Sequence, residues 1–222
     1  LKTKPTQHSV NKIREIGIQP DILVCRSELP FPSSIRKKIA LFCNVAPQDV
    51  INAIDLGVIY EVPLNLHEEG LDTRICEHLQ LTNLQEPDLD NWKEIVRRGK
   101  NPEYQVKIAV CGKYTEHQDA YKSITEALNH GGIAHNAKVE IVWIDVERIS
   151  DYDRDKICNE IDGILVPGGF GLRGIKGKVA AVKCAREKKI PFFGICLGMQ
   201  CAVMEFAQNV ANLEDSNSTE FD

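Results

Sequence analysis

The chain has 222 residues, with 27 lysines and arginines against 32 aspartates and glutamates, so its formal charge is −5. Hydrophobic residues make up 43% and charged residues 27%, as in an ordinary globular protein. No Lys/Arg-rich stripe, apolar run near the roughly 18 residues of a membrane span, or N-terminal signal segment occurs, so we expect no nucleic-acid or membrane partner and no secretion.

In chain order, the first apolar runs predict strands at Asp21–Cys25, Ile39–Asn44 and Val58–Val62. Later runs predict strands at Val106–Cys111, Val139–Val146, Gly163–Val166 and Ile190–Ile195. Amphipathic stretches predict helices at Asp119–His130, Arg154–Ile161 and Lys176–Lys188, the first with a C-cap at Gly131-Gly132. Valine- and isoleucine-rich strands that alternate with helices are typical of parallel sheets buried on both faces, so we expect an α/β fold.

Polar, turn-rich stretches at 86–90 and 97–102 flank a short helical piece that contains Trp92, and a fresh strand follows them. We therefore expect a first domain at 1–85, a linker at 86–103 and a second domain at 104–222, each with part of a parallel sheet. The termini, Leu1 and Asp222, lack a start Met and a tail, so we interpret the chain as an internal piece of a longer protein.

Eight cysteines are too few for a disulfide scaffold of this length. Cys25, Cys43, Cys111 and Cys196 lie within or at the end of apolar runs, where cysteine behaves as a small hydrophobe. No CxxC pair occurs, so we expect no zinc site and no other metal site in this chain. We expect a reduced, cytoplasmic protein.

The strongest chemical signal is Gly194-Ile195-Cys196-Leu197-Gly198, which joins an apolar strand to a helix predicted at Met199–Ala207. This is the pattern of a nucleophile elbow with cysteine in place of serine. The thiol would lie beside a helix N-terminus, which lowers its pKa, and the Leu197 amide could donate to an oxyanion. A buried structural cysteine is the alternative.

A second signal, Pro167-Gly168-Gly169-Phe170-Gly171, directly follows the strand at Gly163–Val166. A glycine turn at the carboxyl edge of a parallel strand can present backbone N–H groups to an oxyanion, since no Cβ obstructs the approach. Taken alone it is an unremarkable loop. Its position one strand–helix unit before Cys196 places both loops at the edge where open α/β sheets bind ligands.

A cysteine nucleophile needs a histidine base and a carboxylate that orients it. The six histidines all precede Cys196, and none follows a strongly predicted strand; they are His8, His67, His78, His117, His130 and His135. The sequence therefore identifies no convincing base.

These motifs resemble the class I, or triad, glutamine amidotransferases, whose histidine and glutamate lie downstream of the nucleophile. Within that class the resemblance is closest to the CTP synthase family and covers essentially the whole chain. It also rests on the stretches Leu1–Val10, Gly17–Asp21, Lys38–Val45, Asp119–Ser123 and Asn217–Phe221. The resemblance implies the end of a Rossmann-like synthetase domain with a P-loop elsewhere, then part of a doubly wound glutaminase domain.

The resemblance implies that ATP phosphorylates the 4-oxygen of UTP and that ammonia, released from L-glutamine through a Cys196 thioester, displaces phosphate to give CTP. Mg²⁺ would accompany ATP, GTP would be an allosteric activator, CTP a product inhibitor, and the full-length protein a homotetramer. It also implies a glutamine site at Gly169, Leu197, Gly198, Met199, Gln200 and Glu220.

The pyrimidine nucleotide, UTP or CTP, is expected at Lys2, Thr3, Lys4, Pro5, Thr6, Gln7 and Lys38, with Pro5 stiffening a loop. Lysines suit a triphosphate, although terminal lysines are more often simply exposed. ATP is expected near Ile54, Asp55 and Leu56, where the basic residue common in the family is absent. Arg173, between Gly171 and Gly174, is a candidate lid residue for the response to GTP.

The 222 residues contain no GxxxxGK[ST] loop and no triad base, so we expect the isolated chain to be inactive. Two alternatives stay open. One is the glutaminase part of another amidotransferase synthetase, which would lack the upstream motifs. The other is a non-catalytic nucleotide-binding or oligomerisation module, which would bind nucleotide without a reactive Cys196.

Overall fold

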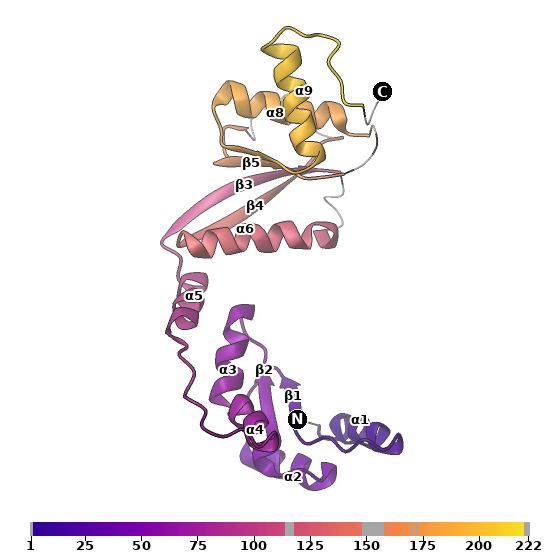
Figure 1. Ribbon diagram of the computed structural model, residues 1–222, viewed down its shortest axis with the longest axis vertical. Coiled ribbons are helices and arrows are strands. Elements are labelled where there is room, and N and C mark those ends of the chain that lie inside the picture. Colours follow the sequence, from indigo (N-terminus) through magenta and orange to yellow (C-terminus); the bar gives the residue numbers. More distant parts are fainter. Residues whose placement is uncertain (1, 114–117, 148–157, 170, 172, 220–222) are drawn as a thin grey trace. The chain divides into compact units, whose positions relative to one another are not determined.

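A computed structural model describes residues 2–113, 118–147, 158–169, 171 and 173–219 (Figure 1). The chain forms two compact units, Leu1–Lys100 and Asn101–Asp222, and each is described by itself. Helix α5 (Asp90–Lys100) occupies much of the expected linker and belongs to unit 1, where Trp92 Nε1 donates to the carbonyl of Tyr60 at 2.6 Å.

Unit 1 contains a two-stranded parallel sheet in which β1 (Leu23–Ser27) pairs with β2 (Val50–Ile54). Its other helices are α1 (Lys4–Glu15), α2 (Ser33–Cys43), α3 (Val62–Glu68) and α4 (Leu71–His78), with 3₁₀ turns η1 (Pro47–Asp49) and η2 (Ile59–Glu61). The core consists of Val10, Leu23, Phe31, Ile39, Ala40, Cys43 and Val50.

Two of the strands predicted in unit 1 are wrong. The run at Ile39–Asn44 belongs to α2, because Ile39, Ala40 and Cys43 are buried at helical spacing while Leu41 and Phe42 face outward. The run at Val58–Val62 forms η2 and the start of α3. The missed strand is β2, whose apolar pattern is interrupted by a buried asparagine, Asn52.

Unit 2 contains a four-stranded parallel sheet in the order β4-β3-β5-β6. The elements are β3 (Tyr104–Gly112), η3 (Gln118–Tyr121), α6 (Lys122–Ala134), β4 (Ala137–Asp145), β5 (Gly163–Val166), α8 (Ile175–Lys188), β6 (Phe192–Gly194) and α9 (Leu197–Asn209). Helix α6 covers one face of the sheet, and α8 and α9 cover the other (Figure 1). The four strands predicted from the sequence are confirmed, as is the α/β class.

The core of unit 2 lies mainly between the sheet and α8. It includes Ala109, Ile144, Val166, Ala181 and Ala185. The predicted cap at Gly131-Gly132 is wrong, because both glycines lie inside α6. A Cβ on Gly132 would lie 2.5 Å from the carbonyl of Ala137, so this glycine lets α6 approach β4. The helix is followed instead by Asn136 in the left-handed region (φ 55°).

The expectation of an entirely reduced chain is also corrected. Cys158 and Cys184 are joined by a disulfide, which ties the segment before β5 to α8, while six cysteines are free. Of the helix predicted at Arg154–Ile161, the first four residues lie outside the described part of the chain. Cys158 and Ile161 are buried in the core.

Candidate functional site

A tight bend joins β6 to α9 at Cys196. This residue has φ 51° and ψ −107°, a positive-φ conformation that residues other than glycine rarely adopt. Its thiol is free and exposed, and the residue is the N-cap of α9. The backbone is that of a nucleophile elbow.

The two glycines that flank the bend are required by packing. A Cβ on Gly194 would lie 2.5 Å from the carbonyl carbon of Gly198. A Cβ on Gly198 would lie 2.1 Å from the carbonyl oxygen of Val166, on the neighbouring strand. Real Cβ atoms do not approach backbone so closely, so both glycines allow the first turn of α9 to lie against the strand ends.

The glycine turn after β5 lies directly beside the bend. Val166 is in register with Gly194, and the N–H of Ile195 donates to the carbonyl of Val166 at 2.9 Å. A Cβ on Gly168 would lie 3.5 Å from the Cβ of Cys196. The structure therefore brings the thiol and the glycine turn together at the carboxyl edge of the sheet, as the sequence predicted.

The other expected glutamine-site residues differ in exposure. Leu197 is fully buried, with its Cδ2 atom 3.6 Å from where a Cβ on Gly169 would lie. Met199 is 55% exposed. Gln200 is half-buried, and its Oε1 atom accepts a hydrogen bond from Ser218 Oγ at 3.0 Å. Glu220 lies outside the described residues.

The contact of Ser218 with Gln200 was not predicted from the sequence. Gln208 Nε2 donates to the carbonyl of Ser216 at 2.7 Å, so the segment after α9 returns along that helix. It thereby reaches Gln200, in the first turn of α9. Only its membership of the Asn217–Phe221 motif pointed to this residue, and that motif gave no reason to pair it with Gln200.

Lys178, on α8, is the second residue that the sequence did not reveal. Its side chain is 1% exposed, and Nζ donates to the carbonyl of Pro167 at 3.2 Å. Nζ also lies 3.3 Å from the position that a Cβ on Gly169 would take. Nothing in the spacing of lysines on α8 marks this one as buried, because Lys176 and Lys183 on the same helix are exposed.

Burial controls the charge of the groups around this site. Burial lowers the pKa of Lys178, and Lys113 lowers it further, whereas the nearby thiols, Cys196 among them, oppose that shift. Burial also raises the pKa of Cys111 to about 12, which keeps that thiol protonated and unreactive. Exposure thus distinguishes Cys196 from a buried thiol of the same unit.

The expected lid residue, Arg173, lies just before α8 and is held by an ion pair. Its Nε atom lies 2.6 Å from Glu147 Oε1, and its side chain is 70% exposed. Gly171 (φ 75°) and Gly174 (φ 77°) adopt left-handed conformations on either side of it. Leu172, between these glycines, lies outside the described residues.

The described histidines belong to unit 1 or lie at α6 of unit 2, and His8 is on α1. His67 Nδ1 is 2.6 Å from Asp72 Oδ2, and His78 is on α4, both in unit 1. His130 lies within α6 and His135 directly follows it. His117 lies outside the described residues.

In unit 1, the expected pyrimidine-nucleotide residues gather at the start of α1. Lys4–Gln7 form the first turn of that helix rather than a loop, which corrects the expectation for Pro5. Thr3 is buried and accepts a hydrogen bond from Gln7 Nε2 at 3.1 Å. Lys2 and Lys4 are exposed, as is Lys38 on α2. Helices α1 and α2 share one core, so these lysines belong to neighbouring helices.

The expected ATP residues lie where β2 ends. Ile54 is the last residue of that strand, and Leu56 is half-buried. Asp55 pairs with Arg26 of β1, with Nε 2.7 Å from Oδ1. Residues 54–56 contain no basic side chain. The fold brings a basic side chain, that of Arg26, to the same edge of the sheet from the adjacent strand.

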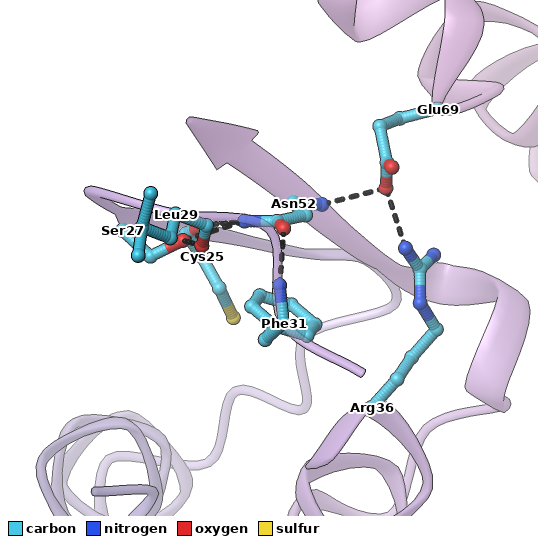
Figure 2. A network of polar contacts seen from close by, with 7 residues as sticks. All are labelled: Cys25, Ser27, Leu29, Phe31, Arg36, Asn52 and Glu69. Carbon is cyan, nitrogen blue, oxygen red and sulfur yellow. Dashed lines mark hydrogen bonds and ion pairs between the residues drawn. The ribbon is translucent and has the colours of Figure 1, made fainter. Parts of the chain in front are cut away.

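A buried polar network supports this edge (Figure 2). The Asn52 side chain donates to Ser27 Oγ at 2.7 Å and accepts from the N–H of Phe31 at 3.0 Å. Its backbone N–H donates to Glu69 Oε2 at 2.9 Å, and the same oxygen pairs with Arg36 at 2.7 Å. A satisfied network of this kind holds one loop geometry between β1 and α2.

In the described part of the chain, no three histidine, cysteine or acidic side chains gather as ligands for a metal ion. No described helix combines the length and the apolar character that crossing a bilayer requires.

Two family models match different parts of the chain. The model described as CTP synthase N-terminus matches residues 1–81, and the model described as glutamine amidotransferase class-I matches residues 116–220. A solved structure titled as the glutaminase domain of Trypanosoma brucei CTPS with bound acivicin is 42% identical, with a TM-score of 0.49. It covers 53% of this chain and 46% of that one.

Curated relatives align along the whole chain. CTP synthases of Caldanaerobacter subterraneus and Methanocaldococcus jannaschii are 54% identical over 222 residues and 57% identical over 228 residues. The alignments cover 100% of this chain and 41% and 42% of those proteins, so the chain spans about two fifths of their length. The upstream match favours this family over other amidotransferase synthetases, as expected from the first domain. The chain belongs to the CTP synthase family.

Proposed function

We propose that a protein carrying this chain converts UTP into CTP, with ammonia from glutamine and activation by ATP. The observation that carries the proposal is the exposed Cys196 thiol at a strained strand–helix bend, with the glycine turn of the neighbouring strand beside it. An amide-cleaving thiol needs these two parts in contact, and a buried structural cysteine needs neither.

In the proposed glutaminase step, the Cys196 sulfur attacks the side-chain amide carbon of glutamine. The carbonyl π electrons move to oxygen, and the tetrahedral oxyanion accepts hydrogen bonds from the Leu197 N–H and from the glycine turn. Protonation of the nitrogen releases ammonia and leaves a thioester. Water then attacks the thioester carbon through a second oxyanion, which releases glutamate and restores the thiol.

The proton of the thiol needs a base. The described histidines lie in unit 1 or at α6 of unit 2. We propose that the base, a histidine oriented by a glutamate, is supplied from outside these 222 residues. The helix N-terminus at Cys196 would stabilise the thiolate that this base creates.

The proposed glutamine site extends from the turn to the start of α9. Gly169 and Leu197 would line the reacting amide, while Gly198 keeps the helix close to Val166. Exposed Met199 and half-buried Gln200 would contact the substrate chain. We propose that Glu220 holds the α-amino group, because it follows Ser218, which contacts Gln200.

The proposed synthetase residues carry positive charge suited to nucleotides. Lys2, Lys4 and Lys38 would bind the UTP or CTP phosphates, with Thr3, Pro5, Thr6 and Gln7 at the base or sugar. Ile54, Asp55 and Leu56 would approach ATP, with Arg26 as the nearby cation. ATP is consumed to make the UTP 4-oxygen a leaving group. Any Mg²⁺ would be held by residues outside this chain.

Regulation and assembly complete the proposal. GTP would activate the glutaminase through the segment around Arg173, CTP would inhibit as product, and the full-length protein would be a homotetramer. The Arg173–Glu147 ion pair would have to open if the segment closes over the site. We propose the cytoplasm as its location, because six of the eight cysteines are free thiols and only Cys158 and Cys184 form a disulfide.

The full-length enzyme tests the function directly. With UTP, ATP and Mg²⁺, CTP should form with either glutamine or ammonia, and Cys196→Ala should abolish only the glutamine-dependent reaction. Ammonia release from glutamine should stop in that variant. Sustained ammonia release by Cys196→Ala would contradict the assignment. Sustained release by the isolated 222-residue chain would contradict the expectation that this chain is inactive alone.

A further inference from the structure

The buried lysine beneath the glycine turn has no place in the mechanism above. Lys178 is 1% exposed, and among the described residues no carboxylate pairs with it. An ammonium without a counter-ion costs free energy to bury, so a protein keeps one where its charge or its hydrogen bonds serve a purpose. Its Nζ atom lies against the glycine turn of the proposed glutaminase site.

The hydrogen bond made by Lys178 determines how a peptide group in the turn is oriented. Nζ donates to the carbonyl of Pro167 at 3.2 Å. In a trans peptide this carbonyl and the N–H of Gly168 point in opposite directions. Because the lysine holds the oxygen on the inner side, the Gly168 N–H is turned to the other side. Rotation of the peptide would instead present a carbonyl oxygen there, which repels an oxyanion.

The orientation of the Pro167–Gly168 peptide group depends on its hydrogen bond with Lys178. Gly168 is the residue whose Cβ position lies 3.5 Å from the Cβ of Cys196. Glycines in a turn rotate at low cost, so the turn by itself does not choose one peptide orientation. A second ammonium, Lys113 Nζ, lies 3.5 Å from the carbonyl of Gly171, at the other end of the turn.

We propose that Lys178 is a positioning residue of the glutaminase: its ammonium holds the Pro167 carbonyl so that the Gly168 N–H faces the oxyanion formed at Cys196. This inference rests on the proposed glutaminase function and adds a residue to it. The lysine contacts neither substrate nor thiol. It acts through one peptide group, and its loss affects the transition state more than the binding of glutamine.

The test uses the full-length enzyme with Lys178→Met, which keeps the length and removes the donor. The matched control is Lys183→Met, the same change at a half-exposed lysine of α8. For Lys178→Met we expect kcat for glutamine hydrolysis to fall about ten-fold or more, with KM for glutamine within two-fold. CTP formation from free ammonia should match the wild type. The control should match the wild type in all three measurements.

Three results would overturn the assignment. The first is a kcat for Lys178→Met within two-fold of the wild type. The second is a loss carried by KM rather than kcat. The third is an equal fall in the ammonia-dependent reaction, which indicates only a structural role. If Lys178→Met does not fold, Lys178→Gln is judged by the same criteria. A wild-type enzyme that releases no ammonia from glutamine would instead overturn the proposed function itself.

Discussion

Cys196 combines two properties that are each unusual for a cysteine in a folded domain. It is exposed, and its backbone lies at positive φ. Such strain persists only where the surrounding structure imposes it, here through the close approach of Gly198 to Val166. The sequence predicted a nucleophile at Cys196 because the glycines two positions before and after it form a motif that can be recognised directly in the sequence. The contacts of Ser218 and Lys178 cannot be recognised in this way, because serine and lysine are common residues with no distinguishing motif here.

Ser218 offers a test at the scale of a single hydroxyl. Ser218→Ala removes the donor to Gln200 Oε1, so we expect KM for glutamine in the full-length enzyme to rise about five-fold. That change corresponds to about 1 kcal/mol for one hydrogen bond. The kcat should stay within two-fold. Ser216→Ala is the control, because Ser216 meets Gln208 through its backbone carbonyl. An unchanged KM in Ser218→Ala would contradict a role for this contact.

At the scale of elements, the bend depends on how closely α9 approaches β5. Gly198→Ala places a methyl group 2.1 Å from the Val166 carbonyl, so the helix must shift. We expect a loss of stability of about 1–3 kcal/mol and a large fall in glutaminase activity, measured by thermal unfolding and ammonia release.

The matched control for Gly198→Ala is Gly131→Ala. Gly131 lies inside α6 with open space around it, so this substitution should stabilise the protein by several tenths of a kcal/mol. Equal stability changes in the two variants would show that crowding at Val166 does not set the position of α9.

The elements of unit 2 could be predicted because its strands are continuous apolar runs bounded by turns. Val166 and Gly194 end neighbouring strands, and both loops of the site follow from that register. In unit 1 the same approach found β1 at Asp21–Cys25 but gave two wrong strands. The apolar run of α2 resembles a strand locally, and its helical burial depends on packing against β2. Strand β2 was missed because Asn52 interrupts its apolar run. A buried asparagine is stable only with hydrogen-bond partners, and those of Asn52 come from residues distant in the sequence.

At the scale of the whole molecule, each unit carries one half of the proposed chemistry. Unit 1 presents exposed lysines and a supported strand edge, and unit 2 presents the thiol and the glycine turn. The two family models match residues 1–81 and 116–220, which corresponds to the same division. The chain spans about two fifths of the length of these relatives.

The central claim is that Cys196 is the nucleophile for glutamine, and covalent trapping tests it most directly. The full-length enzyme is treated with an electrophilic glutamine analogue, and the modified cysteine is identified by mass spectrometry of the digested protein. We predict one adduct, on Cys196, whose formation is slowed by glutamine, while buried Cys111 and Cys201 stay unmodified. An adduct on another cysteine, or labelling of Cys196 that glutamine does not slow, would contradict the account.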